Sequence, residues 1–149
     1  GGSVRVYIKR KQFLSMPRVQ IESAFDIKAW AKEAGQQRLN LIKAILLAKQ
    51  TGGRIFGVGC PSRAVSLIHW AGLEPFLDCV CELPGSPKVG CYVPGTRLEI
   101  VGESILFGDG QPEFCLLLSW HLGDGLMKTL RAKGFRGEFL VPLPTAKVV

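Results

Sequence analysis

The chain has 149 residues, of which 47% are hydrophobic, and a formal net charge of +7. This length and apolar content suffice for the core of one domain, but no apolar run approaches the roughly 18 residues that span a membrane. The basic residues are dispersed apart from a cluster at residues 9–11, without the basic and aromatic element that a nucleic-acid surface requires. The composition therefore predicts a globular domain that binds neither nucleic acid nor membrane.

The cysteines are odd in number and include no Cys-x-x-Cys pair; they are Cys60, Cys79, Cys81, Cys91 and Cys115. Cys79 and Cys81 would share one face of a strand, but no second pair at ligand spacing completes a zinc site. We therefore expect buried free thiols and no metal, which is typical of a reducing cytoplasm.

The N-terminal segment alternates apolar and polar residues over residues 3–8, which predicts a strand, and continues as a basic connection to Pro17. The chain starts Gly1-Gly2-Ser3 instead of Met, so we expect it to be processed, tagged or cut from a longer protein. Helical spacing follows from about Ser23 to Lys49, with Gly35 predicted to bend or break the helix. Gly52 and Gly53 are expected to end it.

A short apolar strand, residues 55–58, leads through Gly57 and Gly59 into a helix that reaches about Ala71. Ser62 is the expected N-cap of this helix. Strand, glycine turn and helix in that order create an anion site, because free amides and the positive helix end point out of the turn. The pattern Gly57-x-Gly59-x-x-Ser62 lacks the third glycine of the dinucleotide fingerprint, so an ordinary packing turn remains the alternative.

The remaining elements alternate in type along the chain. We expect strands at 77–81, 98–100, 114–119 and 138–141, a helix at 122–133, and a long loop rich in Pro and Gly at 82–96. This order predicts an α/β fold, a Rossmann-like parallel sheet of about five strands flanked by helices, with an N-terminal strand and helical arm. Ligands of such sheets bind beyond the carboxyl ends of the strands, where the strand order reverses.

The candidate site lies at this reversal if strands 55–58 and 114–119 are neighbours. Residues 59–63 would then form one wall, residues 120–121 the other, and the loop 82–96 the roof. The predicted substrate-binding residues are Gly57, Gly59, Cys60, Pro61, Ser62, Arg63, Glu82, Lys88, Tyr92, Trp120 and His121.

Simpler interpretations of these residues stay open. Glu82 stands where a dinucleotide fold places its ribose-binding acid, but it is equally suited to pairing with a nearby base. Arg63 is either part of the anion cradle or a solvated charge. His121 has the pKa range of a general acid or base, yet no nucleophile or orienting partner is identifiable, so we predict hydrogen bonding and assign no catalytic residue.

Several of these stretches together resemble the C-terminal domain of bacterial S-adenosylmethionine-dependent C-methyltransferases that act on nucleotide-linked deoxy sugars. They are residues 1–7, the turn Gly57-Val58-Gly59-Cys60-Pro61-Ser62-Arg63, the loop segments 87–90 and 92–96, Trp120-His121, and residues 139–144. The resemblance implies that residues 1–22 are a junction strand and linker from an absent methyltransferase domain and that residues 23–149 form the Rossmann-like domain.

The chain departs from the family pattern at the candidate site. Cys60-Pro61-Ser62-Arg63-Ala64 replaces Ala-Pro-Ala-Lys-Gly, Glu82 replaces Asp, and Trp120-His121 replaces Trp-Asn. The acidic residue expected next falls on Gly125, beside Asp124. Arg63 keeps the positive charge as a rigid planar group instead of a point charge. These changes predict an altered ligand or weakened binding.

The family binds S-adenosylmethionine, and zinc through a cysteine module, in a preceding part that this chain lacks, together with the proton-abstracting residues. The resemblance thus implies a substrate-side domain that holds a nucleotide-sugar or another anionic molecule against the methyltransferase domain and is inactive alone. Two alternatives are a stand-alone nucleotide-binding module of the NAD or coenzyme A type, and a structural interaction domain whose pocket has decayed.

Overall fold

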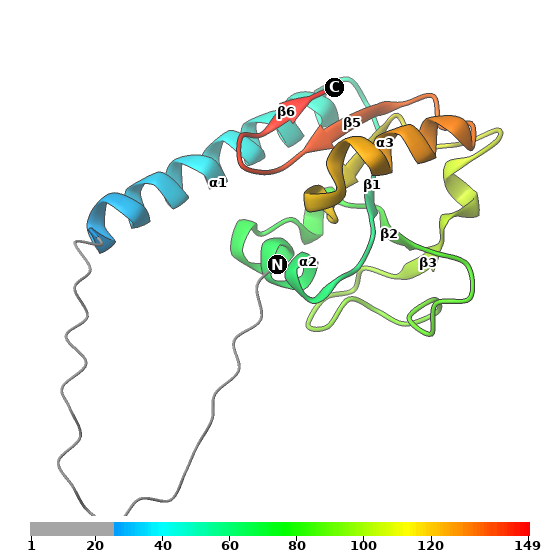
Figure 1. Ribbon diagram of the computed structural model, residues 1–149, viewed down its shortest axis with the longest axis horizontal. Coiled ribbons are helices and arrows are strands. Elements are labelled where there is room, and N and C mark those ends of the chain that lie inside the picture. The colour runs from blue at the N-terminus through cyan, green and yellow to red at the C-terminus, as the bar shows by residue number, and fades with distance from the viewer. Residues whose placement is uncertain (1–25) are drawn as a thin grey trace, which may run out of the picture.

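In the computed structural model the described residues are 26–149, and they form a sheet with helices on both faces (Figure 1). The predicted strand at 3–8 and the basic connection after it lie outside the described residues. The strands are β1 (Ile55–Val58), β2 (Cys79–Glu82), β3 (Ile100–Gly102), β4 (Phe114–Leu117), β5 (Glu138–Val141) and β6 (Lys147–Val148). The α-helices are α1 (Ile27–Gln50), α2 (Ser62–Ala71) and α3 (Gly123–Ala132), and the 3-10 helices are η1 (Glu74–Phe76), η2 (Glu103–Leu106) and η3 (Trp120–Leu122).

The strand order is β3-β2-β1-β4-β5-β6, and all neighbours are parallel except β5 and β6. β1 pairs with β2 on one side and with β4 on the other, with Ile55 opposite Phe114. The predicted α/β fold is confirmed, and so is the adjacency of β1 and β4. The strand order reverses between these two strands, so the carboxyl end of β1 lies at the switch point where open α/β sheets bind ligands.

Two apolar layers cover the sheet because successive side chains of each strand point to opposite faces. On one face Ile55 and Leu116 pack with residues of α1 and α2, including Ile45 and Leu67. On the other face the core is closed by Leu130 of α3, together with Leu106 of η2 and the strand residues Phe56, Cys79, Cys81, Cys115, Leu117 and Phe139. The central strands are thus buried on both sides, which is why their sequences are continuously apolar.

Helix α1 is a single helix of 24 residues, so the prediction of a bend or break at Gly35 was wrong. The side chain of Asp26 caps its first turn by accepting from the amides of Lys28 and Ala29. One glycine costs about 1 kcal/mol in a helix interior, and the cap and the packing of the C-terminal half outweigh it. The N-terminal half extends away from the sheet (Figure 1). Among residues 26–149, neither α1 nor a shorter helix has the length and apolar content to cross a bilayer.

Helix α2 begins one residue earlier than predicted. Pro61, with φ −71° and ψ 164°, occupies the N-cap position, and Ser62 is the first helical residue. No side chain caps α2, so the expected capping role of Ser62 was wrong. Proline supplies the extended entry conformation but has no oxygen on its side chain that accepts from the first-turn amides.

The predicted strands exist with shifted bounds. β2 and β3 begin two residues later than expected, β4 ends at Leu117, and η3 separates it from α3. β6 was not predicted, since 138–141 was expected to be the last strand; it returns antiparallel to β5 beyond Pro142 and Pro144.

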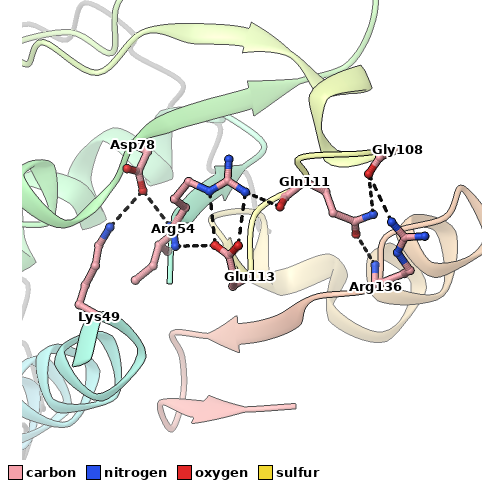
Figure 2. Close-up of polar contacts among 8 residues, drawn as sticks. Lys49, Arg54, Asp78, Gly108, Gln111, Glu113 and Arg136 are labelled. Atoms are coloured by element: carbon pink, nitrogen blue, oxygen red, sulfur yellow. Dashed lines mark hydrogen bonds and ion pairs between the residues drawn. The ribbon is translucent and has the colours of Figure 1, made fainter. Parts of the chain in front are cut away.

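The amino edge of the sheet is closed by the protein's own polar groups (Figure 2). Arg54, before β1, donates from its amide to Glu113 Oε2 at 2.7 Å and from its guanidinium to the carbonyl of Gln111. Asp78, before β2, accepts from the amide of Ile55 and from Lys49 Nζ. These contacts join the starts of β1, β2 and β4 and stabilise their register.

We expect Glu113 to titrate near pH 2, because the amide and guanidinium of Arg54 lower the pKa of this carboxyl from its usual 4.5 to about 2. Its folded pKa lies below its unfolded value, so its contribution to stability is complete above pH 4.5 and is lost as the pH falls towards 2. A carboxyl-detected NMR titration measures this pKa. Arg54→Met removes the guanidinium but keeps the backbone amides of residues 54 and 113, and it should move the pKa part of the way back towards 4.5; an unchanged value would contradict the assignment.

Candidate functional site

The turn after β1 is packed tightly against the end of β4. Gly59 has φ +80°, a left-handed conformation, and its amide donates to the carbonyl of Cys81 at 2.8 Å. A Cβ placed on Gly59 would lie 2.3 Å from Ser119 Oγ. Only glycine meets both conditions without rearrangement, so this position brings the strand ends of β1 and β4 together.

The first amide after Gly59, that of Cys60, is already bonded to a carboxylate of the protein, the side chain of Glu82. The amide of Cys60 donates to Glu82 Oε2 at 3.1 Å, and the amide of Leu83 donates to Glu82 Oε1 at 3.1 Å. Lys88 Nζ donates to the Cys60 carbonyl at 2.7 Å and lies 3.3 Å from Glu82 Oε2. Glu82 therefore pairs with a nearby base, Lys88, as its simpler interpretation held. The bonds of Lys88 also hold the loop between β2 and β3 against the turn after β1.

The electrostatics of this cluster follow from burial and these bonds. Burial alone would raise the pKa of Glu82, but the Leu83 and Cys60 amides and the Lys88 ammonium together lower it below its usual value. Burial raises the pKa of the Cys60 thiol. At neutral pH Glu82 is thus a carboxylate that holds Lys88, and Cys60 is a protonated thiol without nucleophilic character.

A pocket of about 360 Å³ lies between α2 and the loop that connects β2 to β3. We call it the loop pocket; its lining residues are Cys60, Ser62, Val65, Pro87, Lys88, Cys91, Tyr92, Pro94 and Ile100. Four of the predicted substrate-binding residues, Cys60, Ser62, Lys88 and Tyr92, thus come from two separate segments of the chain to line one cavity.

The loop that covers this pocket is held by contacts that the sequence analysis did not anticipate. His69 Nε2 lies 2.8 Å from the carbonyl oxygen of Pro94, which links α2 to the loop. The backbone of the loop also bonds to β3, where the Gly90 amide donates to Ile100 and the Ile100 amide donates to Cys91. His69 is not among the predicted site residues, because no local signal distinguishes a histidine in a helix that binds a distant carbonyl.

A second hollow, of about 430 Å³, lies where β4 and β5 end. We call it the tryptophan hollow; it is lined by Trp30, Glu33, Ala34, Gln37, Trp120, Leu143 and Pro144. Trp120 faces α1 here, while Cys60 lines the loop pocket, although both pack against the same apolar core. The predicted crevice is therefore not one cavity: these two hollows lie on either side of the switch point between β1 and β4, and a smaller one of about 100 Å³ lies at the strand ends, where Gly59, Glu82 and Ser119 are among its lining residues.

The other predicted residues lie outside both hollows. His121 is exposed in η3, with its ring edge-on to that of Trp120 at a centroid distance of 6.4 Å. Arg63 is exposed on α2 and has no ion-pair partner within residues 26–149. Gly57 is buried inside β1, and Pro61 is half-buried at the start of α2. Gly57 and Pro61 flank the turn after β1, and Arg63 lies beside it in the first turn of α2.

The arrangement is suited to binding a ligand. Within residues 26–149 no group of three or more His, Cys, Asp or Glu side chains is placed to hold a metal ion. Two hollows at the carboxyl edge of a parallel sheet, with an ammonium and a guanidinium nearby, provide a place for an anionic molecule.

The comparison with protein families shows to which family this domain belongs. The profile described as "C-methyltransferase C-terminal domain" matches residues 1–144. The chain belongs to this family. No curated protein matches it in sequence. The matched residues 1–144 include every residue that lines the two hollows.

Proposed function

We propose that this domain is the substrate-side part of a C-methyltransferase that uses S-adenosylmethionine, and that it holds a nucleotide-linked sugar or a similar anionic substrate. The observation that carries the proposal is the loop pocket, which gathers Cys60, Ser62, Lys88 and Tyr92 at the switch point. The isolated domain binds and does not methylate.

The chemistry of the loop pocket suits a nucleoside. Its volume of about 360 Å³ lies in the range of small-molecule sites. Val65, Pro87, Pro94 and Ile100 give apolar walls, and the aromatic ring of Tyr92 offers a surface for a base. These walls are closed on the sheet side by the buried residue Ile100.

The mouth of the loop pocket suits the phosphates of such a ligand. Ser62 starts α2, where the helix dipole is positive and no side chain caps the first-turn amides. The Lys88 side chain is 47% exposed although its ammonium is bonded to Glu82 and Cys60, so it can reach a phosphate from the same place. Arg63 adds a second cation at this end of α2.

The hydrogen bonds that Glu82 makes within the protein weigh against a stand-alone NAD-binding module. In a dinucleotide fold the acid after the second strand accepts from ribose hydroxyls. Here both oxygens of Glu82 are engaged, by the amides of Cys60 and Leu83. We further propose that S-adenosylmethionine, zinc and the proton-abstracting groups belong to the methyltransferase domain, the partner of this domain in the cytoplasm.

An NMR titration of the chain with uridine diphosphate and UDP-glucose tests this function. We expect shifts at Ser62, Lys88 and Tyr92, and a Lys88→Met variant that binds about tenfold or more weakly, since a hydrogen bond to a charged group contributes roughly 1.5–3 kcal/mol. Lys43→Met, on the exposed side of α1, is the matched control and should bind like the parent chain. Absence of shifts around the loop pocket would refute the proposal, as would methyl transfer by the chain alone when S-adenosylmethionine is added.

A further inference from the structure

The tryptophan hollow is built from parts of the chain that the loop pocket does not use. Trp120 follows β4 directly, Leu143 and Pro144 follow β5, and the projecting half of α1 forms the facing wall. Its position beyond β4 and β5 places it across the switch point from the loop pocket.

A buried polar atom in this hollow lacks a hydrogen bond. Gln37 Oε1 is shielded from solvent, and no donor among the described residues reaches it. A buried acceptor left unpaired costs about 1–3 kcal/mol, and most such atoms in folded proteins have a partner. Gln37 lines the hollow together with Glu33, one helical turn earlier. Glu33 offers carboxylate oxygens to whatever occupies the hollow, and rotation of the Gln37 carboxamide would turn its unpaired oxygen towards the same occupant.

The charge of the lining excludes a phosphate here. Among the described residues the only charged group that lines this hollow is the carboxylate of Glu33. A fitting ligand therefore supplies hydrogen-bond donors and carries no negative charge. The indole of Trp120, which is half-buried, and the apolar Leu143 and Pro144 require in addition an apolar face.

A sugar ring combines these properties, because its faces present C–H groups while its rim carries hydroxyl donors. We infer that the tryptophan hollow binds the sugar portion of the substrate, with Trp120 against a face of the ring and with Gln37 and Glu33 accepting from its hydroxyls. This inference takes the identity of the substrate from the proposed function. The chemistry of the hollow follows from its own lining residues.

The three tryptophans of the chain supply the test and its internal control. Trp30 and Trp120 line the hollow, whereas Trp70 lies on α2 outside both hollows. Millimolar D-glucose should shift the indole N–H resonances of Trp30 and Trp120 and leave that of Trp70 in place. UDP-glucose should shift the same two resonances together with those of the loop pocket, and UDP alone should shift only the latter.

Neighbouring glutamines on α1 allow a matched pair of variants. Gln37→Leu keeps the size of the side chain but removes the acceptor, and it should weaken glucose binding roughly three- to tenfold. Gln36→Leu changes an exposed glutamine whose side chain donates to Asn40, and glucose binding should stay within twofold of the parent chain. Urea unfolding of both variants shows whether they are folded, and Glu33→Gln serves as the second probe of the hollow should Gln37→Leu not fold.

The outcomes separate this inference from the proposed function. Equal shifts of all three indoles, no shift of Trp30 and Trp120 with glucose and UDP-glucose, or undiminished binding by Gln37→Leu would overturn the sugar site. A response of these indoles to choline but not to glucose would also overturn it in favour of a cation. Glucose shifts at Trp30 and Trp120 without any response to UDP would support the sugar site and refute the nucleotide pocket.

Discussion

Gly59→Ala is expected to lower the free energy of unfolding by about 2–4 kcal/mol. A residue with a Cβ pays roughly 1–2 kcal/mol for the left-handed conformation that Gly59 adopts at φ +80°. The new methyl would also meet Ser119 Oγ at 2.3 Å, and such overpacking costs about 1–3 kcal/mol more. Urea denaturation followed by tryptophan fluorescence measures the loss.

Gly85→Ala isolates the conformational part of this effect. Gly85 has φ +78°, but a Cβ on it meets no atom within 4 Å, so only the cost of the left-handed conformation of roughly 1–2 kcal/mol applies. Adding Ser119→Ala to Gly59→Ala removes the Oγ and should restore part of the stability. Equal losses for Gly59→Ala and Gly85→Ala would show that the contact between the ends of β1 and β4 is loose.

Leu118→Ala should destabilise the domain by about 2–4 kcal/mol. Leu118 is fully buried directly after β4, and truncation of a buried leucine removes apolar contacts and leaves a cavity. Its Cδ1 lies 2.6 Å from where a Cβ on Gly57 would stand, which explains why a glycine occupies the middle of β1. Chemical denaturation of the variant gives the free-energy change.

The double variant Gly57→Ala/Leu118→Ala tests this pairing. The alanine methyl at position 57 would fill space that Leu118 vacates, so the double variant should lose about 1 kcal/mol less than the sum of the two single changes. Leu122→Ala, at a leucine that is 56% exposed in η3, should change stability by no more than about 0.5 kcal/mol. Strict additivity of the two buried changes would contradict the close packing of Gly57 on Leu118.

The core of the fold was predictable because its signals are local and repeated. Continuous apolar runs at 55–58 and 114–117 are buried on both faces of the sheet, and alternation of strands with helices predicts parallel pairing. The neighbour relation of β1 and β4 was a condition of the candidate site, and the structure meets it.

The predictions that failed, at Gly35, at Ser62 and at β6, have different physical causes. Gly35 has open space around it and lies inside one continuous helix, which Asp26 caps at its start. Packing of this helix outweighed the break that the low helix propensity of glycine favoured. At α2, Ser62 has the side chain of a cap, but Pro61 holds the preceding extended position. β6 is only two residues long and owes its strand geometry to pairing with β5, which no pattern within those residues reveals.

The site was predictable as a region and less so as an arrangement. Residues that follow strands of a parallel sheet must lie at its carboxyl edge, so Cys60, Glu82 and Trp120 are all found there. Their directions depend on tertiary contacts: Glu82 turns to the Cys60 amide, and Trp120 turns to α1. The bond from His69 to Pro94 is of the same kind, since its partners are 25 positions apart.

The pairing of β1 with β4 has a consequence for how the protein is made. Arg54 and Glu113, which meet at the start of these strands, are 59 positions apart, so β1 stays incomplete on the ribosome until more than half of the domain has been synthesised. Contacts of such long range slow folding. Until β4 emerges, the apolar strand Ile55–Val58 has a free edge. We therefore expect nascent chains that stop before Phe114 to depend on chaperones, and the turn at Gly59 to pack against Ser119 only after β4 has been synthesised.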